Sequence, residues 1–556
     1  MNNLHEIFTN YLLEEAEDNV RYFLKRQIPD GPRAGAIPDP DILWPPFPRN
    51  ASIRLLEMVS VWLSPASSFY QNPEIPRRGL LTLAWLAREQ RPSGNIDLYT
   101  CNFDSAPDSG FFLWDLIPLM NLLEGAEKNT NLSKETREAA GDLLKEDRAL
   151  ILRVLEGLRS GGFHTANHRW VNSSNLAAGY KLTGNQAYLD RANQYLAEGI
   201  DCNEDGEYSE RSAIYNAVNN QGMITLFESL GDKKYLSYVQ RNLSMLSNYF
   251  EADGSLFTEN STRQDRGTKM YAGHYLYQYL YIGHYLKDTE AMRMASWIAK
   301  WYLKEKVKPA PDCLYSLILH PELKLEDAKN NLTLPDYHRY FKTSGVVRYK
   351  KDSFTYSLLK DNSKWLCFSS GSLNCYSKMS LGYFSHGPVK IQELEVLPDG
   401  YRFAYHADGY YFEPLDKPTG DLINFRTEDH SLRRKQVPNS SEMIVTVHHR
   451  DKRIELNFEG SGCTGVHYCF EFVLPPGIPV AGDHFAVLPK PGDYLLIKDG
   501  SAVIRNGMDA LKISGAFADD NIFATSRNAD PRSLDSFTLY MNATAPYNKT
   551  MTIEAV

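Results

Sequence analysis

Two short stretches in the first half of the sequence carry side chains that could hold an anion and move protons. The stretch 167–170 reads Asn-His-Arg-Trp, and the stretch 210–215 begins with Glu-Arg and ends with Tyr215. Tyr215 lies about one helical turn beyond the Glu-Arg pair, so these three side chains can share one face. Arg, Asn and protonated His neutralise carboxylates, whereas Tyr and His are common general acids and bases. The two stretches therefore indicate chemistry on a substrate that carries a carboxylate.

One reaction that uses this mixture directly is β-elimination of a uronic-acid glycoside. The C5 proton beside the carboxylate is weakly acidic, so its removal needs a base and a preorganised electrostatic clamp on the carboxylate. An acid must also protonate the oxygen that leaves C4. The candidate side chains from the two stretches and from neighbouring loops are Asp104, Asp108, His164, Asn167, His168, Arg169, Glu210, Arg211, Tyr215, Glu259, Arg263 and Gln264.

A weak internal repeat predicts how these side chains are positioned. Four loops, at Gly94, Gly162, Gly206 and Gly254, each contain a nearby aromatic residue followed by polar residues and a predicted helix. The last three glycines are 44 and 48 positions apart, and each interval holds two predicted helices. Helix hairpins repeated in this way build a solenoid or a closed α/α toroid, and five or six hairpins in one domain favour the toroid. In a toroid these loops open at the same end, so we expect their polar residues to converge on one cleft.

The hydrophobic pattern changes near the middle of the chain. Up to about residue 306, apolar residues recur every three or four positions, which predicts helices. The predicted helices cover residues 3–26, 52–64, 77–90, 108–127, 133–159, 170–183, 185–200, 211–230, 233–250, 269–287 and 288–305. Further on, short alternating runs and Asp-Gly turn pairs predict antiparallel strands. We therefore expect an α+β chain with a helical domain at 1–306, a proline-containing junction at 307–345 and a β domain at 346–556.

The composition is that of a soluble globular protein and argues against several classes. The 556 residues carry a formal charge of −9, and 43% are hydrophobic, so the chain is neither disordered nor collagen-like and is long enough for two to four domains. An acidic chain without a basic stripe argues against nucleic-acid binding, and the sequence lacks the run of about 18 apolar residues that would indicate a membrane span. Seven scattered cysteines without a CxxC pair and a start without a signal peptide predict a cytoplasmic protein, or a secreted or periplasmic one if a leader was removed.

The two polar stretches resemble the heparinase II/III-like polysaccharide lyases. The matching residues are Asn167-His168-Arg169-Trp170, which open a predicted helix, and Asp205-Gly206 with Glu210-Arg211-Ser212 and Tyr215. The resemblance implies an incomplete toroid of five or six α/α hairpins followed by an antiparallel β-sandwich. It also implies a lyase that cleaves glucuronate-type bonds in anionic oligosaccharides or polysaccharides. By this resemblance, Asn167 and His168 would neutralise the uronate or act as the base, and Tyr215 would be the general acid/base.

Lyases of this family also take a histidine from the β domain, usually in a His-Gly-His-Ala-Asp-like stretch. In this chain the stretch is split between residues 385–388, Ser-His-Gly-Pro, and residues 405–409, Tyr-His-Ala-Asp-Gly. We expect His386 to supply the third catalytic group. His406 is the alternative and a candidate for binding substrate.

The resemblance also bears on cofactors and partners. Some family members hold a structural metal in the sandwich, and the candidate ligands here for zinc or calcium are His406, Asp408 and His430. Their spacing matches no closed zinc pattern, and catalysis through Tyr and His requires no cofactor. Lyases of this shape often dimerise, so a homodimer stays open by analogy.

Two other functions stay open on the sequence. A glycoside hydrolase on the same kind of toroid, acting on unsaturated uronides, needs carboxylates that Asp104 and Asp108 could provide. A non-catalytic carbohydrate-binding protein would use the same cleft without turnover. In either case Trp170, beside the polar loops, is a candidate platform for stacking on a sugar. A dehydrogenase or phosphotransferase is disfavoured because no GxGxxG or Walker-type glycine loop precedes a helix.

Overall fold

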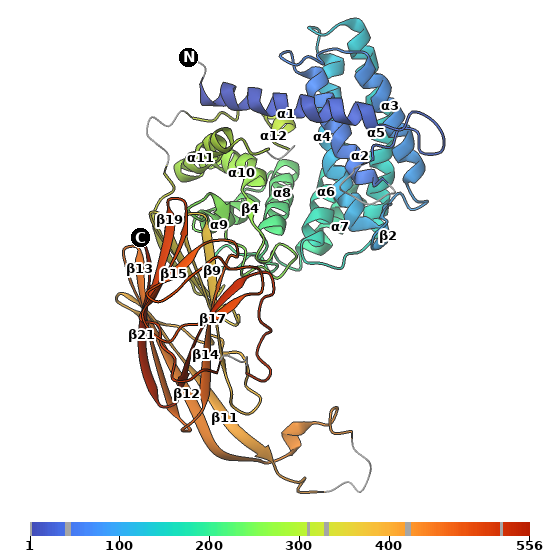
Figure 1. Cartoon of the computed structure of the whole chain (residues 1–556). Helices are drawn as coiled ribbons and strands as arrows, with labels where there is room; N and C mark the ends of the chain where they lie inside the picture. Colours follow the sequence, from blue (N-terminus) through green and yellow to red (C-terminus); the bar gives the residue numbers. More distant parts are fainter. Residues whose placement is uncertain (1–2, 39–45, 309–311, 327–332, 418–423, 523–525) are drawn as a thin grey trace. The chain divides into compact units, whose positions relative to one another are not determined.

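The computed structural model describes residues 3–38, 46–308, 312–326, 333–417, 424–522 and 526–556. Within it the chain forms two compact units (Figure 1). The first, here called the helical unit, comprises residues 1–247 and 261–334, and the second, the β unit, comprises residues 248–260 and 335–556. Among the described residues, no helix is both long enough and apolar enough to cross a membrane.

The helical unit contains the twelve α-helices that the described residues form, together with three very short strands. The helices are α1 (Leu4–Arg26), α2 (Pro48–Leu63), α3 (Glu74–Glu89), α4 (Ala106–Lys128), α5 (Lys134–Ser160), α6 (His168–Thr183), α7 (Gln186–Leu196), α8 (Ala213–Leu230), α9 (Lys234–Leu246), α10 (Gly273–Tyr285), α11 (Thr289–Glu305) and α12 (Asp312–Leu319). The strands are β1 (Ile96–Leu98), β2 (Asn102–Ser105) and β4 (Met270–Tyr271). The eleven predicted helices are all present, with ends shifted by a few residues.

The even-numbered helices form a closed inner ring, which confirms the predicted α/α toroid. Each of α2, α4, α6, α8 and α10 contacts the next in the series, α10 contacts α12, and α12 contacts α2 again. The odd-numbered helices α3, α5, α7, α9 and α11 pack against this helix ring from outside. Since inner and outer helices alternate along the chain, the inner helices run in the same direction. Their N-termini therefore gather at one end of the ring.

Short caps explain the tight connections between helices. Gly184 and Gly231 end α6 and α8 in the left-handed conformation, with φ of 70° and 74°, which glycine adopts without steric cost. The side chain of Asn185 then accepts a hydrogen bond from the Ala187 amide and starts α7. These residues reverse the chain within a few positions, so successive helices pack as antiparallel neighbours.

The β unit is a sandwich of two large sheets. Its strands are β3 (Ser255–Leu256), β5 (Tyr337–Phe341), β6 (Val346–Lys351), β7 (Phe354–Leu359), β8 (Leu366–Ser370), β9 (Leu373–Leu381), β10 (Glu395–Leu397), β11 (Gly400–Phe412), β12 (Lys435–Arg450), β13 (Arg453–Gly462), β14 (His467–Leu474), β15 (Val480–Gly482), β16 (Ala486–Val487), β17 (Tyr494–Leu496), β18 (Ser501–Asn506), β19 (Asp509–Ser514), β20 (Phe537–Thr544) and β21 (Tyr547–Ala555). The sheet orders are β10-β11-β12-β13-β21-β19-β18-β15-β16 and β17-β20-β14-β9-β8-β7-β6-β5. Among the described strands of these two sheets, neighbours pair antiparallel except β17 with β20.

One hydrophobic core joins the two sheets. Val445 and Leu456 from the first sheet and Phe470 and Leu539 from the second belong to the same buried cluster. Along the middle of β12, buried and partly exposed residues alternate, as expected for strands with one face on a core. This arrangement is the sandwich that the resemblance implies.

The segment 248–260 joins the β unit through a buried ion pair, although its sequence neighbours are helical. Arg348 on β6 is fully buried, and its Nη1 lies 2.9 Å from a carboxylate oxygen of Glu251. Thr355 and Ser369 also donate hydrogen bonds to Glu251. A buried guanidinium must be paired with a carboxylate, which explains why this loop groups with the sandwich. The segment 307–345, which the sequence assigns to a junction, contains helix α12 and strand β5.

Candidate active site

The N-terminus of α6 holds Asn167 in a fixed orientation. Asn167 is fully buried, and its Nδ2 donates to both carboxylate oxygens of Glu210, at 3.0 and 2.8 Å. Its backbone amide also donates to Glu210, at 3.1 Å, and Nδ2 lies 3.1 Å from the Thr165 hydroxyl. The amide nitrogen is therefore occupied. Asn167 Oδ1 has no hydrogen-bond partner among the described residues, which leaves it as an acceptor.

The N-terminus of α8 positions Tyr215. The Ser212 hydroxyl caps the helix by accepting a hydrogen bond from the Tyr215 amide at 3.2 Å. The same hydroxyl donates to Asp265 at 3.0 Å, and Asp265 also accepts from the Ala213 amide at 2.8 Å. Because Ser212 and Asp265 are both buried, this contact ties the loop 261–265 to the start of α8.

That loop brings two donors to the phenol oxygen of Tyr215. Gln264 Nε2 lies 3.0 Å from the oxygen and Arg263 Nη2 lies 3.4 Å from it. The Arg263 guanidinium is also 4.7 Å from the centre of the Tyr215 ring. The hydrogen bond to Tyr215, with the charge of Glu210 adding to it, raises the pKa of Arg263. A permanent positive charge therefore lies against the phenol.

Glu210 connects the two predicted stretches. Arg263 Nε lies 3.5 Å from Glu210 Oε1, so contacts run without a break from Asn167 through Glu210 and Arg263 to Tyr215. Burial raises the pKa of Glu210, while the hydrogen bond from Asn167 and the charge of Arg263 oppose that rise. The repeat places Arg263 in the fourth loop, but its contact with Tyr215 depends on the Ser212–Asp265 bond, for which the sequence gives no signal.

His168 is buried beside this network and is neutral. Its ring packs edge-on against His164 at 4.8 Å and against Phe111 at 6.2 Å between centroids. Burial, followed by the charges of His164 and Arg263, lowers the pKa of His168 to about 4, although Asp108 opposes the shift. Its Nδ1 has no hydrogen-bond partner in the described part of the chain. A neutral imidazole can accept a proton but cannot act as a cationic clamp.

Two of the predicted binding residues, Arg169 and Trp170, are engaged in contacts with an acidic segment. Trp170 is fully buried and its Nε1 donates to Asp201 at 2.8 Å, so it cannot stack on a sugar. Arg169 lies over the Trp170 indole and pairs with Glu198 at 3.1 Å and Asp201 at 3.2 Å. These contacts fix the start of α6 to its outer neighbours.

Arg211 pairs with an acidic residue of its own loop. Its Nε lies 3.6 Å from Glu207, and the side chain is partly exposed. Its backbone adopts φ of 51°, a left-handed conformation that is rare for a residue with a side chain. This turn reverses the chain just before Ser212 and places the Ser212 side chain where it caps α8.

Asp104 and Asp108 are engaged in building the first loop. Asp104 accepts hydrogen bonds from Ser93 and from Asn95, the latter at 3.0 Å. Asp108 accepts from the Ser105 hydroxyl at 2.5 Å and from Asn102 at 3.0 Å. Asp108 additionally places negative charge near His168. Both carboxylates therefore help to fix the shape of this loop.

The β-unit candidates form local pairs. His386 Nε2 lies 2.9 Å from the Asp408 carbonyl oxygen, and its Nδ1 lies 3.5 Å from the Tyr405 hydroxyl. His406 pairs with the Asp408 carboxylate at 3.0 Å, and both side chains are more than half exposed.

The candidate metal ligands do not form one set in the structure. His430 lies 3.4 Å from Glu428 and stacks on Phe412, apart from the His406–Asp408 pair. Within the described ranges, no group of three or more His, Cys, Asp or Glu side chains is close enough to hold a metal ion. The metal stays an untested prediction.

Solved structures with a similar fold identify the fold class of this chain. The chain matches a Paenibacillus xanthan lyase with a TM-score of 0.59 and 10% identity over 100% of this chain and 58% of that protein. It matches heparinase III with a TM-score of 0.51 and 10% identity over 90% of this chain and 76% of that protein. A β-L-arabinofuranosidase from Geobacillus stearothermophilus reaches a TM-score of only 0.35, too low to support an argument.

No family model and no curated protein matches the sequence. The matches to the xanthan lyase and to heparinase III, with TM-scores above 0.5, cover nearly the whole chain, so they include both the helix ring and the sandwich. The resemblance read from residues 167–170 and 205–215 is thus confirmed at the level of the fold. This chain has the two-unit fold of the polysaccharide lyases, an α/α toroid followed by an antiparallel β-sandwich.

Proposed function

We propose that this protein is a lyase that cleaves uronic-acid glycosides by β-elimination. The observation that carries the proposal is the contact of Arg263 and Gln264 with the phenol oxygen of Tyr215, beside a neutral His168. A base, a phenolic proton donor and a cation therefore lie at one end of the helix ring. These are the groups that elimination next to a carboxylate needs.

The chemistry follows from the state of each group. His168 removes the C5 proton, the electron pair of that bond forms the C4–C5 double bond, and the bond from C4 to the departing oxygen breaks. Tyr215 gives its phenolic proton to that oxygen. Arg263, which stays cationic and is 31% exposed, neutralises the carboxylate and stabilises the charge that develops on it.

Asn167 has a different role in this proposal from the carboxylate clamp that the resemblance implies. Its amide nitrogen is taken by Glu210 and Thr165, so only Oδ1 can meet a substrate. A carbonyl oxygen accepts hydrogen bonds and repels a carboxylate. Asn167 is therefore assigned to a substrate hydroxyl, and Glu210 is a positioning residue that holds both Asn167 and Arg263.

The direction of the inner helices supports an anionic substrate. The N-termini of α2, α4, α6, α8, α10 and α12 gather at the end of the ring that carries the candidate residues. Each N-terminus has a partial positive charge from its unpaired amides, and together they favour an anion at that end. The names of the two similar structures, a xanthan lyase and a heparinase, support a polysaccharide or an oligosaccharide derived from one.

Ultraviolet absorbance tests the proposal. Elimination creates a double bond conjugated to the carboxylate, which hydrolysis does not. The enzyme is incubated with glucuronate-, galacturonate- and iduronate-containing oligosaccharides and polysaccharides, with and without a chelator. A rising absorbance that the chelator leaves unchanged is the expected result. New reducing ends without absorbance would replace the lyase by a hydrolase, and no product from any member of the panel would contradict both.

A further inference from the structure

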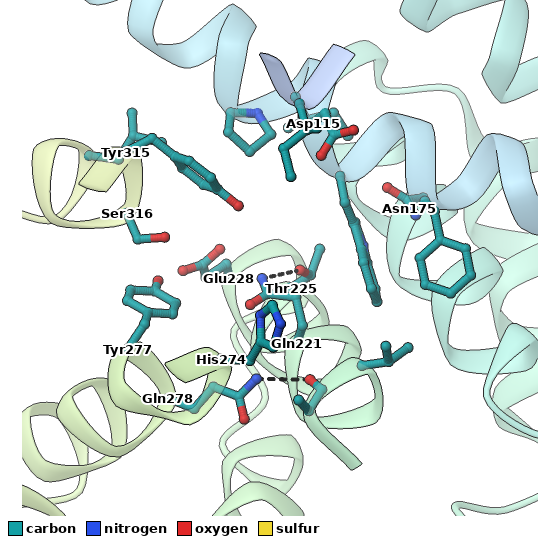
Figure 2. Close-up of a pocket in the computed structure, with 18 of the residues that line it drawn as sticks. Asp115, Asn175, Gln221, Thr225, Glu228, His274, Tyr277, Gln278, Tyr315 and Ser316 are labelled. Carbon is teal, nitrogen blue, oxygen red and sulfur yellow. Dashed lines mark hydrogen bonds between the residues drawn. The ribbon is translucent and has the colours of Figure 1, made fainter. Parts of the chain in front are cut away.

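A cavity occupies the interior of the helix ring (Figure 2). Its volume is about 310 Å³, and residues from all six inner helices line it. Representative lining residues are Ile53 on α2, Trp114 on α4, Asn175 on α6, Gln221 on α8, Tyr277 on α10 and Tyr315 on α12. The volume is at the lower end of the roughly 300–1,000 Å³ typical of small-molecule sites, which suits a short saccharide rather than a polymer.

The cavity borders the candidate active site at Phe111 and continues along the ring, although His168, Tyr215 and Arg263 are not among its lining residues. Phe111, which packs against His168, lines it, and so does Ile214, next to Tyr215. On α8 the lining residues extend from Ile214 to Glu228. At about 1.5 Å per residue, that stretch of helix spans roughly 20 Å. The cavity is therefore a neighbour of the candidate active site, separated from His168 by the Phe111 ring, and it extends along α8.

The wall of the cavity contains polar atoms that lack a partner. Asn175 is fully buried, and its Nδ2 donates to the carbonyl oxygens of Gly110 and Val171 at 2.9 and 2.8 Å. Its Oδ1, like Trp114 Nε1, has no hydrogen-bond partner among the described residues. A buried polar atom without a partner lowers the stability of the fold. The Asn175 acceptor and the Trp114 donor are therefore available to hydrogen-bond hydroxyl groups of a ligand. In Figure 2, the Asn175 amide stands at the cavity edge opposite Tyr315.

The charged groups that line the cavity have no excess of positive charge, since Arg49 is offset by two carboxyl groups. Asp115, which accepts a hydrogen bond from Ser52 at 2.6 Å, and Glu228 both line it. Glu228 lies 3.5 Å from His320, and burial raises the pKa of Glu228. A sulfate or a second uronate would meet these carboxyl groups as well as Arg49 in a confined space, so the lining offers an anion no net attraction. Aromatic faces such as those of Trp114 and Tyr277, with amide groups between them, are suited to an uncharged sugar.

We propose that this cavity binds the neutral, unsulfated end of the saccharide, and that the lyase therefore acts from a chain end and releases a short product of fixed length. A chain can enter the interior of a closed helix ring only end first. The part of the proposal that concerns chain-end cleavage rests on the lyase function proposed above. The binding of a neutral sugar does not.

Calorimetric titration tests the binding directly. The probes are the neutral sugars glucose, galactose, mannose, rhamnose and N-acetylglucosamine, and the charged sugars glucuronate and glucose 6-sulfate. Gln221→Trp and Asn121→Trp both fill the cavity with a larger side chain. Because Asn121 is exposed, the larger side chain at that position should not prevent folding. Asn175→Leu removes the unpaired acceptor. Gln194→Trp on the outer helix α7, an exposed position, is the matched control.

At least one neutral sugar is expected to bind, and both tryptophan variants and Asn175→Leu should weaken it by roughly tenfold or more, while Gln194→Trp leaves it unchanged. No binding by any neutral sugar would overturn the proposal. So would equal weakening in the control, or charged sugars that bind as tightly as neutral ones and are lost in the same variants.

Product lengths test the chain-end mode separately. Mass spectrometry during the lyase reaction should find one short product from the earliest time point. A ladder of lengths would overturn chain-end cleavage while leaving the lyase intact. If the uronate panel yields no unsaturated product, the lyase proposal fails, and the titration still decides whether the cavity takes a neutral sugar.

Discussion

The candidate residues of the helical unit and those of the β unit differ in how they are held. Asn167, Glu210, Arg263 and Tyr215 come from three loops and are joined by unbroken contacts of 2.8 to 3.5 Å. In contrast, His406 and Asp408 form an exposed pair, and both nitrogens of His386 contact groups of their own unit.

This difference indicates where preorganisation lies. Buried polar groups must satisfy one another, so the first cluster is fixed before substrate arrives, and fixed donors are what stabilise a developing charge. Exposed pairs contribute little, since water competes for them. The proposed mechanism therefore places both proton transfers in the helical unit, and the following predictions test that placement from the largest effect to the smallest.

Tyr215→Phe removes the phenolic proton and should reduce turnover by about 10²–10⁴-fold, the range of general acid–base catalysis. Saccharide binding should survive because the ring remains. The measurement pairs the initial rate of ultraviolet absorbance with calorimetric binding of the substrate. Near-normal turnover would show that the proton comes from elsewhere.

Arg263→Gln should reduce kcat/KM by about 10²–10³-fold because it removes the cation beside the phenol and the carboxylate. Arg211→Gln, in the motif but directed to Glu207, is the matched control and should change the rate less than tenfold. Comparable losses in the two variants would mean that the contact between Arg263 and Tyr215 does not explain the effect of Arg263 on kcat/KM.

The pKa of His168 links it to stability. Because burial lowers the folded-state pKa to about 4 from the usual 6.5, His168 takes up a proton on unfolding once the pH is below about 6.5. Its stabilising contribution is therefore full above pH 6.5 and is lost as the pH falls towards 4. Between pH 7 and pH 5 this loss amounts to about 2 kcal/mol.

Urea unfolding of the native protein and of His168→Gln at both pH values measures this effect. The native protein should lose about 2 kcal/mol more than the variant between pH 7 and pH 5. Equal losses would indicate that His168 titrates normally and is charged in the site at acidic pH.

His386→Ala should reduce kcat/KM less than tenfold if the helical unit supplies both proton transfers. The initial rate on the substrate that gives the largest signal measures it. A loss as large as that of Tyr215→Phe would instead assign a catalytic group to the β unit, as the resemblance implies.

The double variant Asp104→Asn/Asp108→Asn should keep turnover within about tenfold, since both carboxylates serve local hydrogen bonds that an amide can partly replace. Reducing ends and ultraviolet absorbance are followed together. Complete loss of both signals in a folded variant would contradict this prediction and show that the reaction depends on these carboxylates.

Much of the helical unit could be predicted because its signals are local. Three- and four-residue spacing defined the helices, and the glycine loops showed that the residues at 164–168 and 210–215 share one end of a toroid. The contact that matters most was not predictable. Arg263 reaches Tyr215 only because Asp265 bonds Ser212, a pairing across more than fifty positions without a spacing rule.

Other features depended on tertiary context too. The segment 248–260 joins the sandwich because Arg348 needs Glu251, and helix α12 is too short to show a period against its proline-rich surroundings. Trp and Arg are residue types that often bind sugars and carboxylates. In this chain, however, Trp170 is buried and bonds Asp201, and Arg169 pairs with Glu198 and Asp201, so both side chains have structural contacts. Residue type alone could not distinguish these uses.

The mass of the products tests the central claim most directly. A defined uronate-containing oligosaccharide is incubated with the enzyme, with Tyr215→Phe as the blank, and all products are weighed by mass spectrometry. Elimination predicts two products whose masses add up to that of the substrate, since no water enters. Products that together exceed the substrate by one water would show hydrolysis and contradict the account.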